Sequence, residues 1–156
     1  MSDSTNDGVR TMAEELGVLI KETQSVLHQR MDEVLRPLGL SVAQYACLQA
    51  LQDAPGINGS ELARRVFVSR QSMNVLVQGL EKRGLIERVE EPGPRRERAT
   101  TLTGQAAALL AQARTAVART ADAMTSGLSP HECAQLLALL ATCRDALVGT
   151  PSSPGA

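Results

Sequence analysis

The chain has 156 residues and a formal net charge of −1, a length that fits one compact domain or two small ones with a core of their own. No apolar run approaches the ~20 residues of a membrane span, and no signal peptide opens the chain, so we expect a cytoplasmic protein. Three cysteines, an odd number, argue against a disulfide framework.

Helix signals extend over most of the chain. Apolar residues recur at helical spacing from about Val9 to Leu35, and Pro37 and Gly39 end this first helix. Five residues are typical helix N-caps and predict the starts of further helices: Ser41, Asn58, Ser69, Thr103 and Ser129. Residues 85–89 and 99–102 are predicted to pair as short strands. The polar ends, residues 1–8 and 149–156, are expected to be flexible.

The segment from Asn58 to Leu102 has the order of elements that a winged helix-turn-helix requires: helix, tight turn, second helix, and a basic hairpin. In the second helix, residues 70–83, one face is apolar and is expected to pack on Leu62 and Val66. That face carries Met73, Leu76, Val77 and Leu80.

The other face of the second helix predicts contact with DNA, because a major groove about 12 Å wide accepts one α-helix. Asparagine and glutamine suit adenine, arginine suits guanine, and a helix N-terminus attracts phosphate. The candidate DNA-binding residues here are Ser69, Arg70, Gln71, Ser72, Asn74 and Gln78. Taken alone, these amides are also compatible with an ordinary solvated surface.

The hairpin tip adds a second candidate contact. Two prolines and a glycine at 92–94 make a stiff turn, and arginines on both sides of it suit a minor groove and its phosphates. These arginines are Arg88, Arg95, Arg96 and Arg98. The neighbouring Glu90, Glu91 and Glu97 leave a salt-bridged loop as the alternative.

Charged residues are distributed unevenly along the chain, in agreement with the predicted DNA contacts. Residues 58–104 hold nine Lys/Arg and six Asp/Glu, a net charge of +3, whereas the remainder has a net charge of −4. This distribution favours a positively charged face for DNA binding on an otherwise acidic protein.

The helices from 103 and from 129 carry apolar residues on broad flanks, which predicts a homodimer. A self-contained monomeric bundle is the alternative.

Together these motifs resemble the MarR family of bacterial transcriptional regulators over residues 10–148. The resemblance rests on four segments: Arg36–Ser41 leading into Gln44-Tyr45, Glu61–Ala63, Leu80–Arg88, and Leu102-Thr103. It implies a mainly α winged helix-turn-helix fold with an obligate dimer. Residues 9–36 and 103–148 would form the helical dimerisation region, 40–102 the DNA-binding lobe, 69–83 the recognition helix, and 88–101 the wing.

Three positions depart from the family pattern or from the usual turn. The family's wing aspartate falls at Pro94, while its arginine partner falls at Arg96, so the pair that commonly braces the wing is missing. The glycine often found four residues past Leu102 is Ala106. Phe67, in a turn where a small residue is common, is expected to pack inward.

The resemblance also implies a switch, either a small aromatic or phenolic effector or oxidation. It places a ligand pocket near the first, second and fifth helices, where the available groups are Gln24, His28, Arg30, Tyr45 and Cys47. The oxidation-sensing branch keeps a cysteine in the first helix, which this chain lacks. Cys133 and Cys143 lie about 15 Å apart along one helix, too far for a mutual disulfide. Thiol sensing stays the alternative to structural cysteines.

No metal-ligand spacing, nucleophile motif or phosphate loop occurs in the sequence, so we expect neither an enzyme nor a cofactor. The prediction is a homodimeric, ligand-responsive repressor that binds a pseudo-palindromic operator. A protein-binding helical adaptor that kept this fold and lost DNA binding is the alternative from another functional class.

Overall fold

The computed structural model describes residues 8–90 and 98–149. The expected flexible ends therefore lie outside the described residues except for Gly8 and Gly149, the latter being the last residue of a helix. The chain forms two compact units, residues 1–120 and 121–156. No helix among the described residues is long and apolar enough to cross a membrane.

The first helix, α1 (Met12–Leu35), begins three residues after the expected Val9 because of a local capping box. The Thr11 hydroxyl accepts a hydrogen bond from the Glu14 backbone N–H at 3.2 Å, and the Glu14 carboxylate accepts one from the Thr11 N–H at 2.6 Å. α1 ends as expected, where a 3₁₀ turn, η1 (Arg36–Leu38), contains the proline and is followed by Gly39 at φ 72°.

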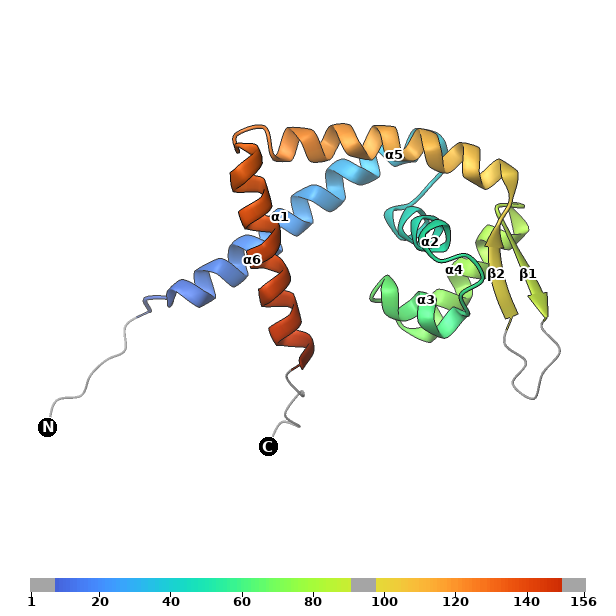
Figure 1. Ribbon diagram of the computed structural model, residues 1–156, viewed down its shortest axis with the longest axis horizontal. Coiled ribbons are helices and arrows are strands. Elements are labelled where there is room, and N and C mark those ends of the chain that lie inside the picture. Colours follow the sequence, from blue (N-terminus) through green and yellow to red (C-terminus); the bar gives the residue numbers. More distant parts are fainter. Residues whose placement is uncertain (1–7, 91–97, 150–156) are drawn as a thin grey trace, which may run out of the picture. The chain divides into compact units, whose positions relative to one another are not determined.

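Three short helices and a hairpin follow, namely α2 (Val42–Asp53), α3 (Gly59–Arg65), α4 (Arg70–Lys82), β1 (Ile86–Glu90) and β2 (Arg98–Leu102). Ser41, Asn58 and Ser69 cap the three helices as predicted, each accepting from a backbone N–H three residues later. Figure 1 shows α3 and α4 beside each other and the hairpin next to α4, and the contacts between these elements agree.

The hairpin is tied to the rest of the lobe along its second strand. β1 pairs with β2 in antiparallel register, with Ile86 opposite Leu102. On the other edge of β2, the Gly56 N–H donates to the Thr100 carbonyl at 3.2 Å, and the Thr100 N–H donates to the Ile57 carbonyl at 3.3 Å. The loop after α2 therefore covers the edge that β1 leaves open, and Thr100 is buried there.

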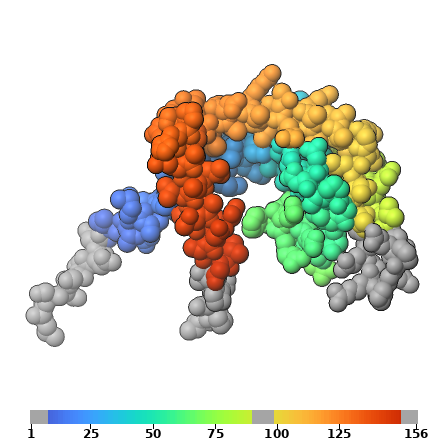
Figure 2. Space-filling model, in the orientation of Figure 1, coloured from blue at the N-terminus to red at the C-terminus, as the bar shows by residue number. Residues whose placement is uncertain are grey.

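One hydrophobic core holds α2, α3, α4 and β1 together with the end of α1. Its members are chiefly leucines with Met73, Val77 and Ile86, as the near absence of aromatic residues requires. α5 (Gly104–Met124), capped by Thr103, adds three buried residues to this core: Ala106, Leu110 and Ala113. The Arg114 guanidinium also donates to the Gln52 side chain at 3.2 Å. Figure 2 shows the yellow-to-orange α5 against the teal α2.

The last helix, α6 (Pro130–Gly149), begins at the predicted Ser129 cap, with reciprocal bonds to Glu132 of 3.0 and 3.2 Å. None of its described residues is buried. Several of its large apolar side chains are exposed instead, namely Leu136, Leu137, Leu139, Leu140, Leu147 and Val148.

Candidate nucleic-acid interface

α4 presents one polar face to solvent because its other face is fixed in the core. Met73, Val77 and Leu80 are buried, and Leu76 packs against the same core. These residues recur at three- and four-residue spacing, so the opposite side of the helix projects outward. The exposed residues on that side and at the N-terminus are Arg70, Gln71, Ser72, Asn74, Val75 and Gln78.

The N-terminal end of α4 is organised by two serines. The Ser69 hydroxyl accepts a hydrogen bond from the Ser72 N–H at 3.1 Å and donates to the Ser72 hydroxyl at 2.9 Å. Ser69 is therefore engaged within the helix cap, while Ser72 and Arg70 remain exposed beside the positive end of the helix dipole. This arrangement suits an incoming phosphate.

The turn before α4 corrects the expectation for Phe67. Its ring is 77% exposed and its backbone lies in the left-handed region at φ 56°. The turn is closed by the Val68 N–H, which donates to the Ala63 carbonyl at 3.1 Å. Val66 and Val68, on either side, pack against the core. The left-handed backbone at Phe67, between two valines that face the core, directs the phenyl ring toward solvent. The expectation that Phe67 packs inward is therefore wrong.

The C-terminal end of α4 is held by contacts that no sequence motif indicated. The Arg83 guanidinium donates to the Gly39 carbonyl at 2.6 Å, across 44 positions of sequence. The Thr103 hydroxyl donates to the Gly84 carbonyl at 2.8 Å. The C-terminal end of α4 is thus anchored to the turn after α1 and to the start of α5.

Arg88 lies at the base of the wing rather than at its tip. Its side chain is only 18% exposed, and its Nε lies 2.5 Å from Glu81 Oε2 on α4. This ion pair connects β1 to the last turn of α4. Arg95, Arg96 and Pro94, at the wing tip, lie outside the described residues, and so does the side chain of Arg98.

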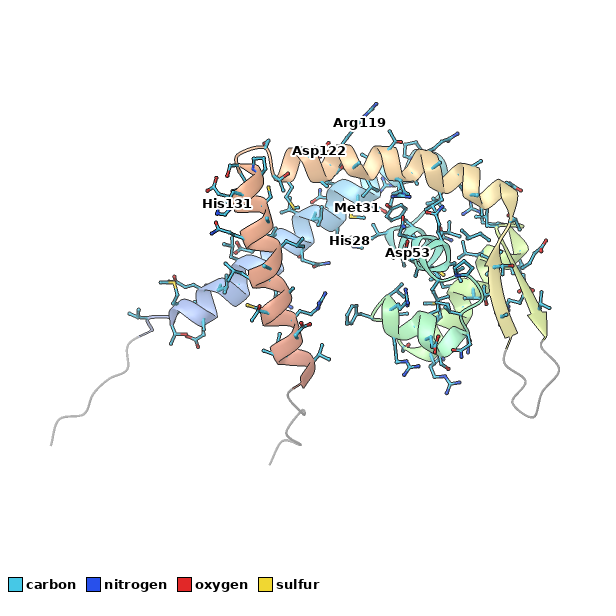
Figure 3. The ribbon with its side chains drawn as sticks, viewed as in Figure 1. His28, Met31, Asp53, Arg119, Asp122 and His131 are labelled. Carbon is cyan, nitrogen blue, oxygen red and sulfur yellow. The ribbon has the colours of Figure 1, made fainter. Side chains whose placement is uncertain are left out.

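The five candidate ligand residues have different surroundings. Gln24, His28 and Arg30 are exposed on α1, where His28 is labelled in Figure 3 and Arg30 pairs with Glu33 at 3.4 Å. On α2, Tyr45 is half-buried whereas Cys47 is fully buried. Burial raises the pKa of Tyr45, against an opposing effect of the Arg114 charge. Burial also raises the pKa of the Cys47 thiol to about 12, so this thiol belongs to the core.

Among the residues that the structure describes, no three His, Cys, Asp or Glu side chains gather in a way that could hold a metal ion. The described site is therefore α4, a helix with an exposed polar face and a capped N-terminus, next to a hairpin that an ion pair joins to it.

Comparison with known proteins decides the family. The family model described as MarR family matches residues 38–97. An HTH-type transcriptional repressor of Mycobacterium tuberculosis is 37% identical over 108 residues, which cover 69% of this chain and 77% of the repressor. The chain belongs to the MarR family.

Solved structures of MarR family proteins agree with this assignment. The transcriptional repressor CouR, solved on a 23-mer DNA duplex, is 31% identical with a TM-score of 0.78, covering 88% of this chain and 99% of CouR. A MarR family protein of M. tuberculosis solved with salicylic acid is 28% identical with a TM-score of 0.68, covering 88% of this chain and 98% of that one. The mainly α winged helix-turn-helix is confirmed. This MarR family protein is a DNA-binding transcriptional regulator and is not an enzyme.

Proposed function

We propose that this MarR family protein is a homodimeric, ligand-responsive repressor of a pseudo-palindromic operator. The observation that carries the proposal is the exposed polar face of α4, which sits on a buried apolar face and starts at a capped N-terminus. Two such helices, one from each subunit, would enter successive major grooves about one helical turn apart.

Within this proposal the candidate residues take different roles. Gln71 and Asn74 read base edges, with Arg70, Ser72 and Gln78 beside them. Ser69, engaged in the helix cap, orients the N-terminus toward a phosphate. At the wing, Arg95, Arg96 and Arg98 hold the minor groove and its phosphates. Arg88 is a positioning residue, because its guanidinium is paired with Glu81.

The dimer would be formed by residues 9–36 and 103–148, leaving 40–102 as the DNA-binding lobe. Support comes from large apolar side chains that are exposed on both helical segments, among them Leu19 and Val26 on α1 and Leu137 on α6. Exposed apolar surface of this extent marks an interaction site. A symmetric dimer also matches the symmetry of a palindromic operator.

The effector would be a small aromatic or phenolic acid, by analogy with the relative that was solved with salicylic acid. Tyr45 is half-buried and carries a hydroxyl, and Gln24, His28 and Arg30 offer exposed polar groups on α1. Arg30 carries the charge that suits a carboxylate. Cys47 is fully buried in the core, so it presents no group at the surface.

The test is fluorescence anisotropy with DNA from just upstream of the protein's own gene, beside a scrambled duplex, at two salt concentrations. A groove binder prefers the upstream duplex and weakens steeply with salt, because each phosphate contact releases counterions. Asn74→Ala should reduce discrimination between the duplexes, by about 1–3 kcal/mol for a bidentate contact. Arg96→Ala should weaken both duplexes alike.

Two outcomes would contradict the proposal. Binding left unchanged by both variants would remove α4 and the wing as the DNA contacts. Weak binding, equal on the upstream and scrambled duplexes at low salt, would favour the protein-binding adaptor.

A further inference from the structure

Val75 is the one apolar residue among the exposed side chains of α4 that face away from the core. It is 68% exposed, whereas the next valine of the same helix, Val77, is 3% exposed. At 3.6 residues per turn, Val75 lies roughly 160° around the helix from the buried Met73. It therefore occupies the middle of the outward face.

The exposed neighbours of Val75 on this face are polar, and they include Gln71, Ser72 and Gln78. Gln71 precedes it by four residues and Gln78 follows it by three, the spacings at which helical side chains adjoin. Asn74 is the next exposed residue on one side. Val75 thus lies between the groups that the proposed function assigns to base reading.

Folding gives no reason for a valine at this position. The side chain buries little surface, and a β-branched residue favours a helix less than alanine, glutamine or lysine. Single exposed apolar residues are common on protein surfaces and need no explanation. In a major groove, however, a valine at the centre of the helix face can contact an apolar group, and the C5 methyl of thymine is the apolar group displayed there.

We propose that Val75 reads the C5 methyl group of a thymine in each operator half-site. This inference rests on the proposed function, in which α4 lies in the major groove. Thymine is the only base that displays a methyl group in that groove, so an apolar side chain distinguishes it from cytosine. Because the flanking Gln71, Asn74 and Gln78 suit adenine, the thymine lies within an A·T-rich part of the half-site.

The experiment begins with a duplex that the protein selects from a random-sequence library. Each thymine of the selected site is then replaced by deoxyuridine, which removes the methyl group and leaves base pairing intact. Affinities are measured for the wild type, for Val75→Ala, and for Val9→Ala as a control. Val9 is an 88% exposed valine that precedes α1, so the control removes the same atoms outside α4 and the wing.

For the wild type, one thymine position per half-site should lose about fourfold in affinity on replacement, the effect of one buried methyl group. Val75→Ala should weaken binding to the thymine duplex. For this variant, replacement of the same thymine by deoxyuridine should change the affinity by less than about twofold. Val9→Ala should keep the wild-type pattern. Thermal unfolding should show both variants folded, since alanine favours a helix at position 75.

Two results overturn the inference, and they are distinguishable. If Val75→Ala binds DNA with the same thymine pattern as the wild type, Val75 does not read a methyl group, although the DNA-binding function stands. If the wild type selects no sequence and binds no duplex at low salt, the proposed function fails and the inference fails with it.

Discussion

Phe67 and Cys47 show how tertiary surroundings set the behaviour of a single side chain. At Phe67 a left-handed backbone costs about 1–2 kcal/mol for a residue with a Cβ, and it leaves the ring exposed. At Cys47 complete burial raises the thiol pKa to about 12 and makes the thiolate, the reactive form, scarce at neutral pH. Redox sensing by Cys47 therefore loses support, whereas Cys143 is exposed.

The raised pKa of Cys47 predicts a pH dependence of stability. An unfolded thiol titrates at about pH 8.5, whereas burial raises the pKa of the folded Cys47 thiol to about 12. The unfolded state therefore loses this proton first as the pH rises. The contribution of Cys47 to stability is complete below about pH 8.5 and is lost as the pH approaches 12.

Urea unfolding at pH 8 and at pH 10.5 measures this effect. Cys47→Val should lose less stability between the two pH values than the wild type does. Cys143→Val, at an exposed cysteine, serves as the control and should follow the wild type. A Cys47→Val variant that loses as much stability as the wild type would show that other groups cause the alkaline loss.

At the scale of elements, α4 is oriented by its two ends. Ser69 caps the N-terminus, and the Arg83 guanidinium fixes the C-terminus to the Gly39 carbonyl. The Glu81–Arg88 ion pair then joins the helix to β1. Pro94 stands where this family commonly has the aspartate that braces the wing. We therefore expect the position of the wing to depend more strongly on the Glu81–Arg88 pair at its base.

Removal of the Glu81–Arg88 pair should therefore affect binding more than folding. Because Glu81 is 44% exposed, solvent screening keeps the pair's contribution to stability at about 1 kcal/mol or less. Arg88→Gln should lower Tm by no more than about 2–4 °C in a chain of this size. It should also weaken binding to all DNA sequences alike, as a misplaced wing would.

Calorimetry and anisotropy measure the two effects. The charge-matched control is Arg119→Gln, at an exposed arginine of α5 that is labelled in Figure 3. If both variants reduce affinity equally, the loss comes from net charge rather than from wing position.

At the scale of the whole molecule, the described residues leave much apolar surface uncovered. α1 exposes Leu16, Leu19 and Val26, and α6 buries none of its described residues. Such surface is costly in water, and the proposed dimer would cover it. Binding to the proposed operator would then depend on this association, because two half-sites require two recognition helices.

Leu137→Asp, at a leucine of α6 that is 74% exposed, should shift the protein from dimer to monomer. The charge is unfavourable in an apolar interface and harmless in an exposed monomer surface. Operator affinity should fall with the dimer. Sedimentation velocity over a concentration series measures the change.

Gln135→Asp is the matched control for this prediction. Gln135 is exposed and lies roughly 160° around α6 from Leu137, so the same charge is introduced on another face. The control should stay dimeric. A Leu137→Asp variant that sediments like the wild type would exclude this part of α6 from the interface.

The sequence alone was sufficient for the order of elements, the helix starts at Ser41, Ser69 and Ser129, and the MarR family. These features depend on bonds between residues three apart, or on motifs that are continuous in sequence. Four features required the tertiary structure: the outward Phe67, the burial of Cys47, the Arg88–Glu81 pair, and the Arg83 bond to Gly39. Each depends on how separate elements pack. Local spacing specifies which residues share a helix face, but only packing decides which side chains meet and which face the solvent.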